Sequence, residues 1–145
     1  MSILVEKARS ALRQAVSAAM ARAMAEGQLP KAEAPAFVLE VPGDRSHGDW
    51  ACNAAMAGAR AFHMAPRKIA ETILAQLDLE GTGFARCEIA GPGFLNFTYE
   101  PGFYGAVLED IRRLGRGYGR SDVGQGKRVL VEYVSANPTG PMHIG

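Results

Sequence analysis

The C-terminal stretch "VEYVSANPTGPMHIG" (residues 131–145) holds the side chains with the most evident chemical use. An apolar run over residues 128–134 leads into a turn rich in proline and glycine, which carries His143 and Gly145. Such a run is typical of a parallel strand that is buried on both faces. A polar loop directly after it resembles the opening of an active site. Glu132 lies inside the run: composition favours a carboxylate facing solvent, whereas a buried one would need a cationic partner.

Two nucleotide-binding loops that depend on glycine are excluded. A P-loop requires glycine five positions before its Gly-Lys pair and serine or threonine after it, but "SDVGQGKR" offers Ser121 and Arg128 at these places. The segment "GRGYG" has the wrong spacing for a dinucleotide fingerprint. The glycine-rich residues 115–127 are therefore predicted to be a connector.

Basic side chains gather in and around this connector. Residues 112–128 contain a single acid, Asp122, against six bases: Arg112, Arg113, Arg116, Arg120, Lys127 and Arg128. A solvated surface is the ordinary interpretation of such a stretch, and contact with phosphate is the alternative. The net charge of the whole chain is +1, which by itself indicates no nucleic-acid partner.

Four segments have the signals of helices. Residues 3–25 place Leu4, Ala8, Ala11 or Leu12, Ala15, Ala19 and Ala23 on one face. Asp49 is predicted to cap a helix that runs to about Phe62. Pro66 suits the first turn of the next helix, and residues 101–114 form the fourth.

Three strands are predicted at residues 36–41, 85–90 and 94–99, the last two joined by Gly91-Pro92-Gly93. Alternation in the third strand puts Phe94 and Asn96 on one face and Leu95 with Phe97 on the other. The expected fold class is α+β, with helices packed on an antiparallel sheet in residues 1–114 and the first strand of a second unit in residues 128–145.

Composition favours a soluble, cytoplasmic protein. Hydrophobic residues make up 48% of the 145 positions and charged residues 21%, which excludes wholesale disorder. Charged residues interrupt the N-terminal segment, so no signal peptide or membrane span is expected. Cys52 and Cys87 lack the spacing of a metal site, and we expect two buried thiols. His47 and Asp49 are expected to cap and pack, not to catalyse.

Three separated segments resemble arginyl-tRNA synthetases of class I. They are "VPGDRSHGDWACNAAM" (41–56), "IAGPGFLNF" (89–97) and the C-terminal "VEYVSANPTGPMHIG" (131–145). The resemblance implies a small tRNA-contacting domain followed by the first strand of a truncated Rossmann-type catalytic domain. The sequence stops inside the His-Ile-Gly-His motif, one residue short of the second histidine.

The resemblance also implies roles for individual residues. His143 and Gly145 match the ATP-binding motif, where an imidazole can donate to phosphate and glycine admits the nucleotide. Glu132, Ser135 and Asn137 match positions that hold the arginine substrate. ATP would be a substrate accompanied by Mg2+, and no metal ligand is expected from this chain.

Phe94 and Asn96 match the positions at which the family contacts a base in the D-loop of tRNA. An aromatic face can stack on an unpaired base while an amide reads its edge. The alternative is that Phe94 is a core residue and Asn96 a polar group near a turn.

The function expected from the resemblance is that of the N-terminal part of an arginine–tRNA ligase, inactive alone. Its parent would be a monomer that takes ATP, L-arginine and tRNA(Arg) and has no membrane partner. The alternative is a free-standing RNA-binding module with a vestigial synthetase-like tail.

Overall fold

The computed structural model describes residues 2–133, and the chain begins with helix α1 (Ile3–Ala25). The predicted first helix is confirmed. Its buried stripe recurs every three or four residues, as a helix packed on a core requires. It consists of Ala8, Leu12, Val16, Ala19, Met20 and Ala23. Of the two candidates at positions 11 and 12, Leu12 is the buried one.

Four antiparallel strands form one sheet in the order β1-β2-β4-β3. These are β1 (Leu39–Glu40), β2 (Trp50–Cys52), β3 (Phe84–Ala90) and β4 (Phe94–Tyr99). The predicted strands 85–90 and 94–99 are confirmed, whereas the strand predicted at 36–41 is reduced to two residues. Together with the helices, this sheet confirms the α+β class.

The helix predicted to start at Asp49 is wrong in its first turn. Trp50–Cys52 is strand β2, and helix α2 (Ala54–Phe62) begins only afterwards. Tertiary pairing outweighs local propensity here, because Trp50 and Cys52 lie opposite Phe97 and Leu95 of β4. The Trp50 indole also donates a buried hydrogen bond of 2.7 Å to the Tyr99 hydroxyl.

Helices α1, α2 and α3 (Pro66–Gln76) pack on one face of this sheet. The predicted helix after Pro66 is confirmed, and its buried residues are Ile69, Ala70 and Ile73. The sheet contributes alternate residues to the same core, as period-two side chains must. These are Leu39, Trp50, Cys52, Phe84, Leu95, Phe97 and Tyr99.

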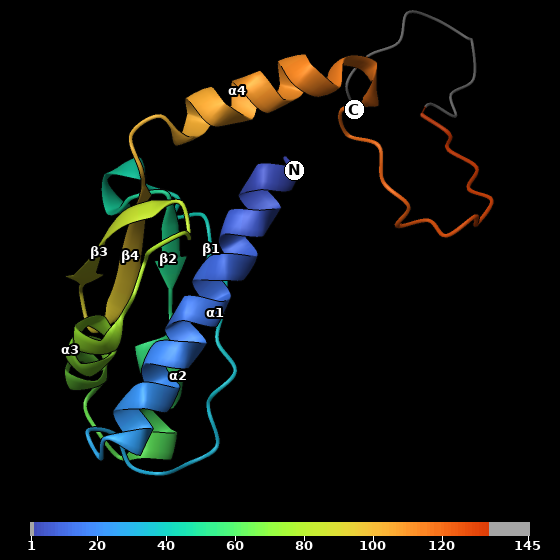
Figure 1. The fold of residues 1–145 in the computed structure, drawn as a ribbon. Coiled ribbons are helices and arrows are strands. Elements are labelled where there is room, and N and C mark those ends of the chain that lie inside the picture. Colours follow the sequence, from blue (N-terminus) through green and yellow to red (C-terminus); the bar gives the residue numbers. More distant parts are fainter. Residues whose placement is uncertain (1, 134–145) are drawn as a thin grey trace, which may run out of the picture.

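Helix α4 (Phe103–Leu114) leaves this core and extends past the sheet, with a short 3-10 turn (Gly115–Gly117) at its end (Figure 1). The predicted helix 101–114 is confirmed. No residue between 101 and 133 is buried. The first turn of α4 contacts the sheet through Phe103 and Tyr104, and Leu4 of α1 lies beside later residues of the helix.

The predicted strand 128–134 does not form in its described part. Residues 128–133 have neither helix nor strand, and Leu130 is 94% exposed. A strand meant to be covered on both faces needs neighbouring strands and helices, and residues 2–127 supply none at this place. Among residues 2–133, no helix is long and apolar enough to cross a membrane.

Candidate functional site

The face of the sheet that α1, α2 and α3 leave uncovered, which we name the open face, carries Phe94 and Asn96. On the other side of the same strand, Leu95 and Phe97 are fully buried in the core. The predicted alternation along residues 94–99 is thus confirmed. Phe94 is half-buried and does not belong to the core cluster. The structure therefore disfavours the alternative in which Phe94 is a core residue.

A small neighbour gives the Phe94 ring room on the open face. Phe94 lies opposite Ala90 of β3, and Asn96 lies between Ala51 of β2 and Glu88 of β3. An alanine on a neighbouring strand leaves the flank of a larger side chain uncovered. Asn96 is nevertheless only 8% exposed, because strands flank it on both sides. A ligand must come down onto the sheet to reach its amide.

The turn before Phe94 is held by the start of α3. Gly93 has φ +143°, and a Cβ at this position would lie 2.9 Å from the carbonyl group of Pro66. The Arg67 guanidinium donates to the Gly91 carbonyl at 3.3 Å. A close backbone approach that admits only glycine thus fixes where β4 begins, and with it the position of the Phe94 ring.

The charges on the open face are mixed. Glu40 and Glu88 are exposed there, and Arg86 lies 3.7 Å from Glu88 and donates to the Thr98 hydroxyl at 3.3 Å. An exposed pair of this kind adds little stability. Because the described strand residues of this face carry two carboxylates, Glu40 and Glu88, against one guanidinium, the face suits an uncharged base better than a phosphate.

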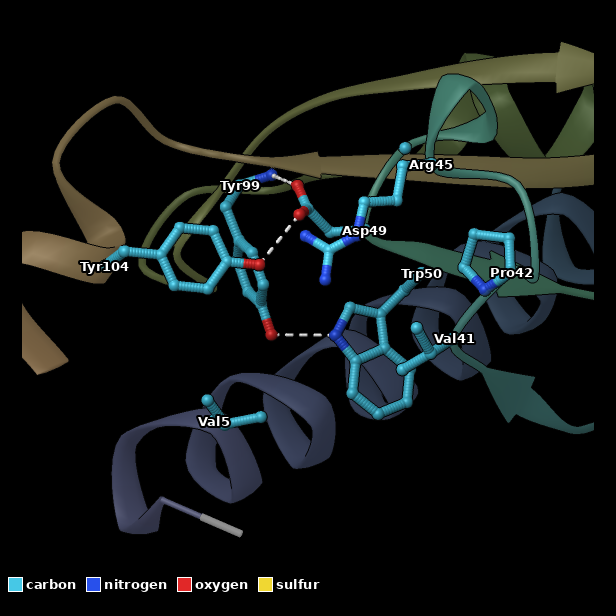
Figure 2. A pocket seen from close by; sticks show the side chains of 9 residues that line it. Val5, Val41, Pro42, Arg45, Asp49, Trp50, Tyr99 and Tyr104 are labelled. Atoms are coloured by element: carbon cyan, nitrogen blue, oxygen red, sulfur yellow. Dashed lines mark hydrogen bonds between the residues drawn. The ribbon is translucent and has the colours of Figure 1, made fainter.

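A second feature joins the sheet to α4 and borders an open cavity of about 160 Å³ (Figure 2). The Asp49 carboxylate accepts from the Tyr99 backbone N–H and from the Tyr104 hydroxyl, both at 2.9 Å. The rings of Tyr99 and Phe103 stack at 3.8 Å between centroids. Partial burial of a side chain that is still 55% exposed, together with the bond to Asp49, raises the pKa of Tyr104 to about 12. We name this arrangement the α4 joint.

Asp49 was predicted to cap a helix, and its role in the α4 joint was missed. The available signal was the glycine before it. Gly48 has φ +86°, and a Cβ there would meet the Phe97 carbonyl oxygen at 2.7 Å. The Asp49 N–H donates to that same oxygen at 2.8 Å. A Gly-Asp pair that approaches another strand so closely marks a tertiary contact and not a helix start.

The remaining predicted site residues are not brought together in the described part. Glu132 is exposed and lies in no helix or strand. Ser135, Asn137, His143 and Gly145 lie outside the described residues. Within residues 2–133, no group of three or more His, Cys, Asp or Glu side chains could hold a metal ion. The arginine and ATP contacts of these residues stay predictions.

The two cysteines are free, with Cys52 buried and Cys87 half-buried. Burial raises the pKa of Cys52 to about 11 and that of Cys87 to about 12. A thiol that holds its proton at neutral pH is a poor nucleophile and a poor metal ligand. Both act as packing residues.

Comparison with known proteins identifies the family of this chain. The "Arginyl tRNA synthetase N terminal domain" family matches residues 7–99. The chain is 49% identical over 142 residues to the arginine–tRNA ligase of Desulforamulus reducens, covering 98% of this chain and 25% of the relative. It is 44% identical to the arginine–tRNA ligase of Caldanaerobacter subterraneus, and the match covers 100% of this chain and 26% of the relative. It thus spans about a quarter of the length of these relatives. The chain belongs to the arginyl-tRNA synthetase N-terminal domain family.

Proposed function

We propose that this chain forms the N-terminal part of an arginine–tRNA ligase and that its open face contacts the tRNA. The observation that carries the proposal is the pair Phe94 and Asn96, held on one uncovered sheet face by the rigid turn before them. An aromatic ring beside an amide is the combination that binds an unpaired base, one group by stacking and the other at the base edge.

The surroundings of the pair support an unpaired base of the D-loop as the ligand. Within residues 2–133, Ala90 is the only strand neighbour opposite Phe94 and leaves the flank of its ring open, whereas Ala51 and Asn96 are both buried. Since Asn96 is 8% exposed, only a flat group lying on the sheet reaches its amide. The neighbouring Glu88 carboxylate is exposed and can accept from a base that carries an amino or imino donor.

In this proposal residues 1–114 are the RNA-contacting unit, residues 115–127 the connector, and residues 128–145 the start of a catalytic unit. The parent would be a cytoplasmic monomer that activates arginine with ATP and transfers it to tRNA(Arg). Glu132, Ser135 and Asn137 would hold arginine, and His143 with Gly145 would contact ATP, whose Mg2+ enters with the nucleotide. The length and names of the relatives favour this function over a free-standing RNA-binding module.

The test is the affinity of the 145-residue chain for tRNA(Arg) with and without the ring. Phe94→Ala should weaken binding about 5- to 150-fold, the range for one base stacked on an aromatic side chain. Asn96→Ala should weaken binding of the preferred base less than Phe94→Ala does, and it should reduce discrimination between bases at that position. Met56→Ala, which removes an exposed apolar side chain from α2, is the control and should change nothing.

Thermal melting of the same variants separates recognition from folding. Because Phe94 lies outside the core cluster, Phe94→Ala should keep the melting temperature within a few degrees of the parent chain. A large drop in melting temperature together with lost binding would show that Phe94 is a core residue. Unchanged melting with unchanged binding would refute the proposed role of the ring.

A further inference from the structure

The charge of this chain is divided unevenly along its length. Residues 112–128 hold six basic side chains against one acidic side chain, a net charge of +5. Because the whole chain carries +1, all other residues together sum to −4. The domain that carries the open face is therefore acidic. A polyanion that approached it alone would meet repulsion at long range.

The basic residues are exposed, and most of them are without an acidic partner. Arg112 pairs with Glu109 at 3.6 Å, and Arg113 pairs with Asp110. The other four, which we name the basic segment, are Arg116, Arg120, Lys127 and Arg128. All four are exposed, and none takes part in the ion pairs found among residues 2–133.

Helix stability accounts for the first two arginines but not for three of the four residues of the basic segment. Arg112 and Arg113 lie in the last turn of α4, where cations stabilise the helix through its dipole. That effect falls off within one turn, and Arg120, Lys127 and Arg128 lie beyond it. Their charge therefore needs another explanation.

The chain around the basic segment has the properties of a surface that follows a phosphate backbone. Tyr118 lies between Arg116 and Arg120, which places an aromatic ring among cations. Five glycines between residues 115 and 126 let the backbone adjust to an irregular anion. Arginine binds phosphate with two parallel donors and keeps its charge at every physiological pH.

We infer that the basic segment is a phosphate-binding site for the same RNA whose unpaired base lies on the open face, an inference that rests on the proposed function. The two sites would make different contacts, since the described strand residues of the open face carry two carboxylates against one guanidinium. Base contact supplies selectivity, and the basic segment supplies affinity that does not depend on sequence.

The two sites are far enough apart to contact different parts of one RNA. Phe94 begins β4 and Tyr99 ends it, a span of about 17 Å at the rise of an extended strand. Helix α4 adds about 18 Å for its 12 residues before the basic segment starts. Helix α4 extends past the sheet (Figure 1), and Ser121, which follows Arg120 of the basic segment, lies beside α1, which covers the other face of the sheet.

The salt dependence of tRNA binding by the 145-residue chain tests this inference. Arg116→Gln with Arg120→Gln should reduce the slope of log K against log salt by about 1.5, which corresponds to a 10- to 100-fold loss at 50 mM salt. The control is Lys31→Gln with Arg60→Gln, which removes the same charge from exposed positions of the domain and should leave the slope nearly unchanged. A non-cognate tRNA should lose affinity equally in the first variant.

The outcomes distinguish the two proposals. If Phe94→Ala weakens binding but both double variants keep the parental slope, the basic segment makes no phosphate contact and the base contact stands. If both double variants reduce the slope equally, the effect is one of overall charge and the inference is overturned. If the parent chain binds no tRNA even at 20 mM salt, the proposed function fails together with it.

Discussion

Replacing Asp49 with alanine should destabilise the domain by about 2–4 kcal/mol, although the side chain belongs to no helix or strand. In this variant the Tyr99 N–H loses the carboxylate oxygen that accepts from it at 2.9 Å. Tyr99 is only 7% exposed, so water cannot readily replace that oxygen. An unsatisfied buried donor costs about 1–3 kcal/mol. The Tyr104 hydroxyl loses its bond to the same carboxylate, and such a bond contributes about 1 kcal/mol.

Tyr104→Phe is the matched control, because it removes the second hydrogen bond and leaves the first intact. Tyr104 is 55% exposed, so water can replace its partner and the cost should stay below about 1 kcal/mol. The double variant should cost no more than Asp49→Ala alone, since both changes remove the same bond.

Urea unfolding followed by the fluorescence of Trp50 gives the free energies directly. This is the single tryptophan of the chain, 3% exposed and bonded to Tyr99 beside the α4 joint. The reasoning is refuted if Asp49→Ala stays within 0.5 kcal/mol of the parent, or if Tyr104→Phe costs as much as Asp49→Ala.

Three further predictions concern the fold. Gly93→Ala should destabilise the chain by at least 1–3 kcal/mol in urea unfolding, because φ +143° and a 2.9 Å approach to Pro66 both exclude a Cβ; a neutral result would show that the turn can move. The free energy of unfolding should fall as pH rises from about 9 towards 12. The folded chain raises the pKa of Cys52 from 9.0 to about 11 and that of Cys87 to about 12, so both thiols keep protons that the unfolded chain releases. Cys87→Ala should flatten that decline, and an unchanged pH profile would contradict the assignment. Truncation after Leu114 should preserve a cooperative thermal transition, because no residue from 115 to 133 is buried, and loss of the far-ultraviolet circular dichroism signal would count against it.

Sequence periodicity predicted the elements whose burial follows from their own pattern. The alternation of residues 94–97 follows from local spacing and is present. The stripe of α1 is present at Ala8, Leu12, Ala19 and Ala23, but Val16 is buried in place of Ala15. The alternation was also sufficient to place Phe94 and Asn96 on one face. The pattern of one strand thus gave the position of the RNA-contact pair, while its role came from the family resemblance.

Strand β2 could not be derived in this way. Trp50, Ala51 and Cys52 are all buried, so the strand shows no alternation, and it runs into an alanine-rich helix. Its pairing with β4 joins residues more than 40 positions apart, which no local pattern encodes. The shielding of Asn96 and the role of Asp49 both depend on that pairing, so both were missed.

The central claim is that the open face binds tRNA. An NMR titration of the 15N-labelled 145-residue chain with tRNA(Arg) tests it most directly, because every backbone amide reports separately. The account predicts the largest shifts at Phe94, Asn96 and the Gly91–Gly93 turn, with a second, salt-sensitive set at Arg116 and Arg120. Shifts confined to the outer surfaces of α1 and α2, with the amides of β4 unchanged at saturation, would contradict it.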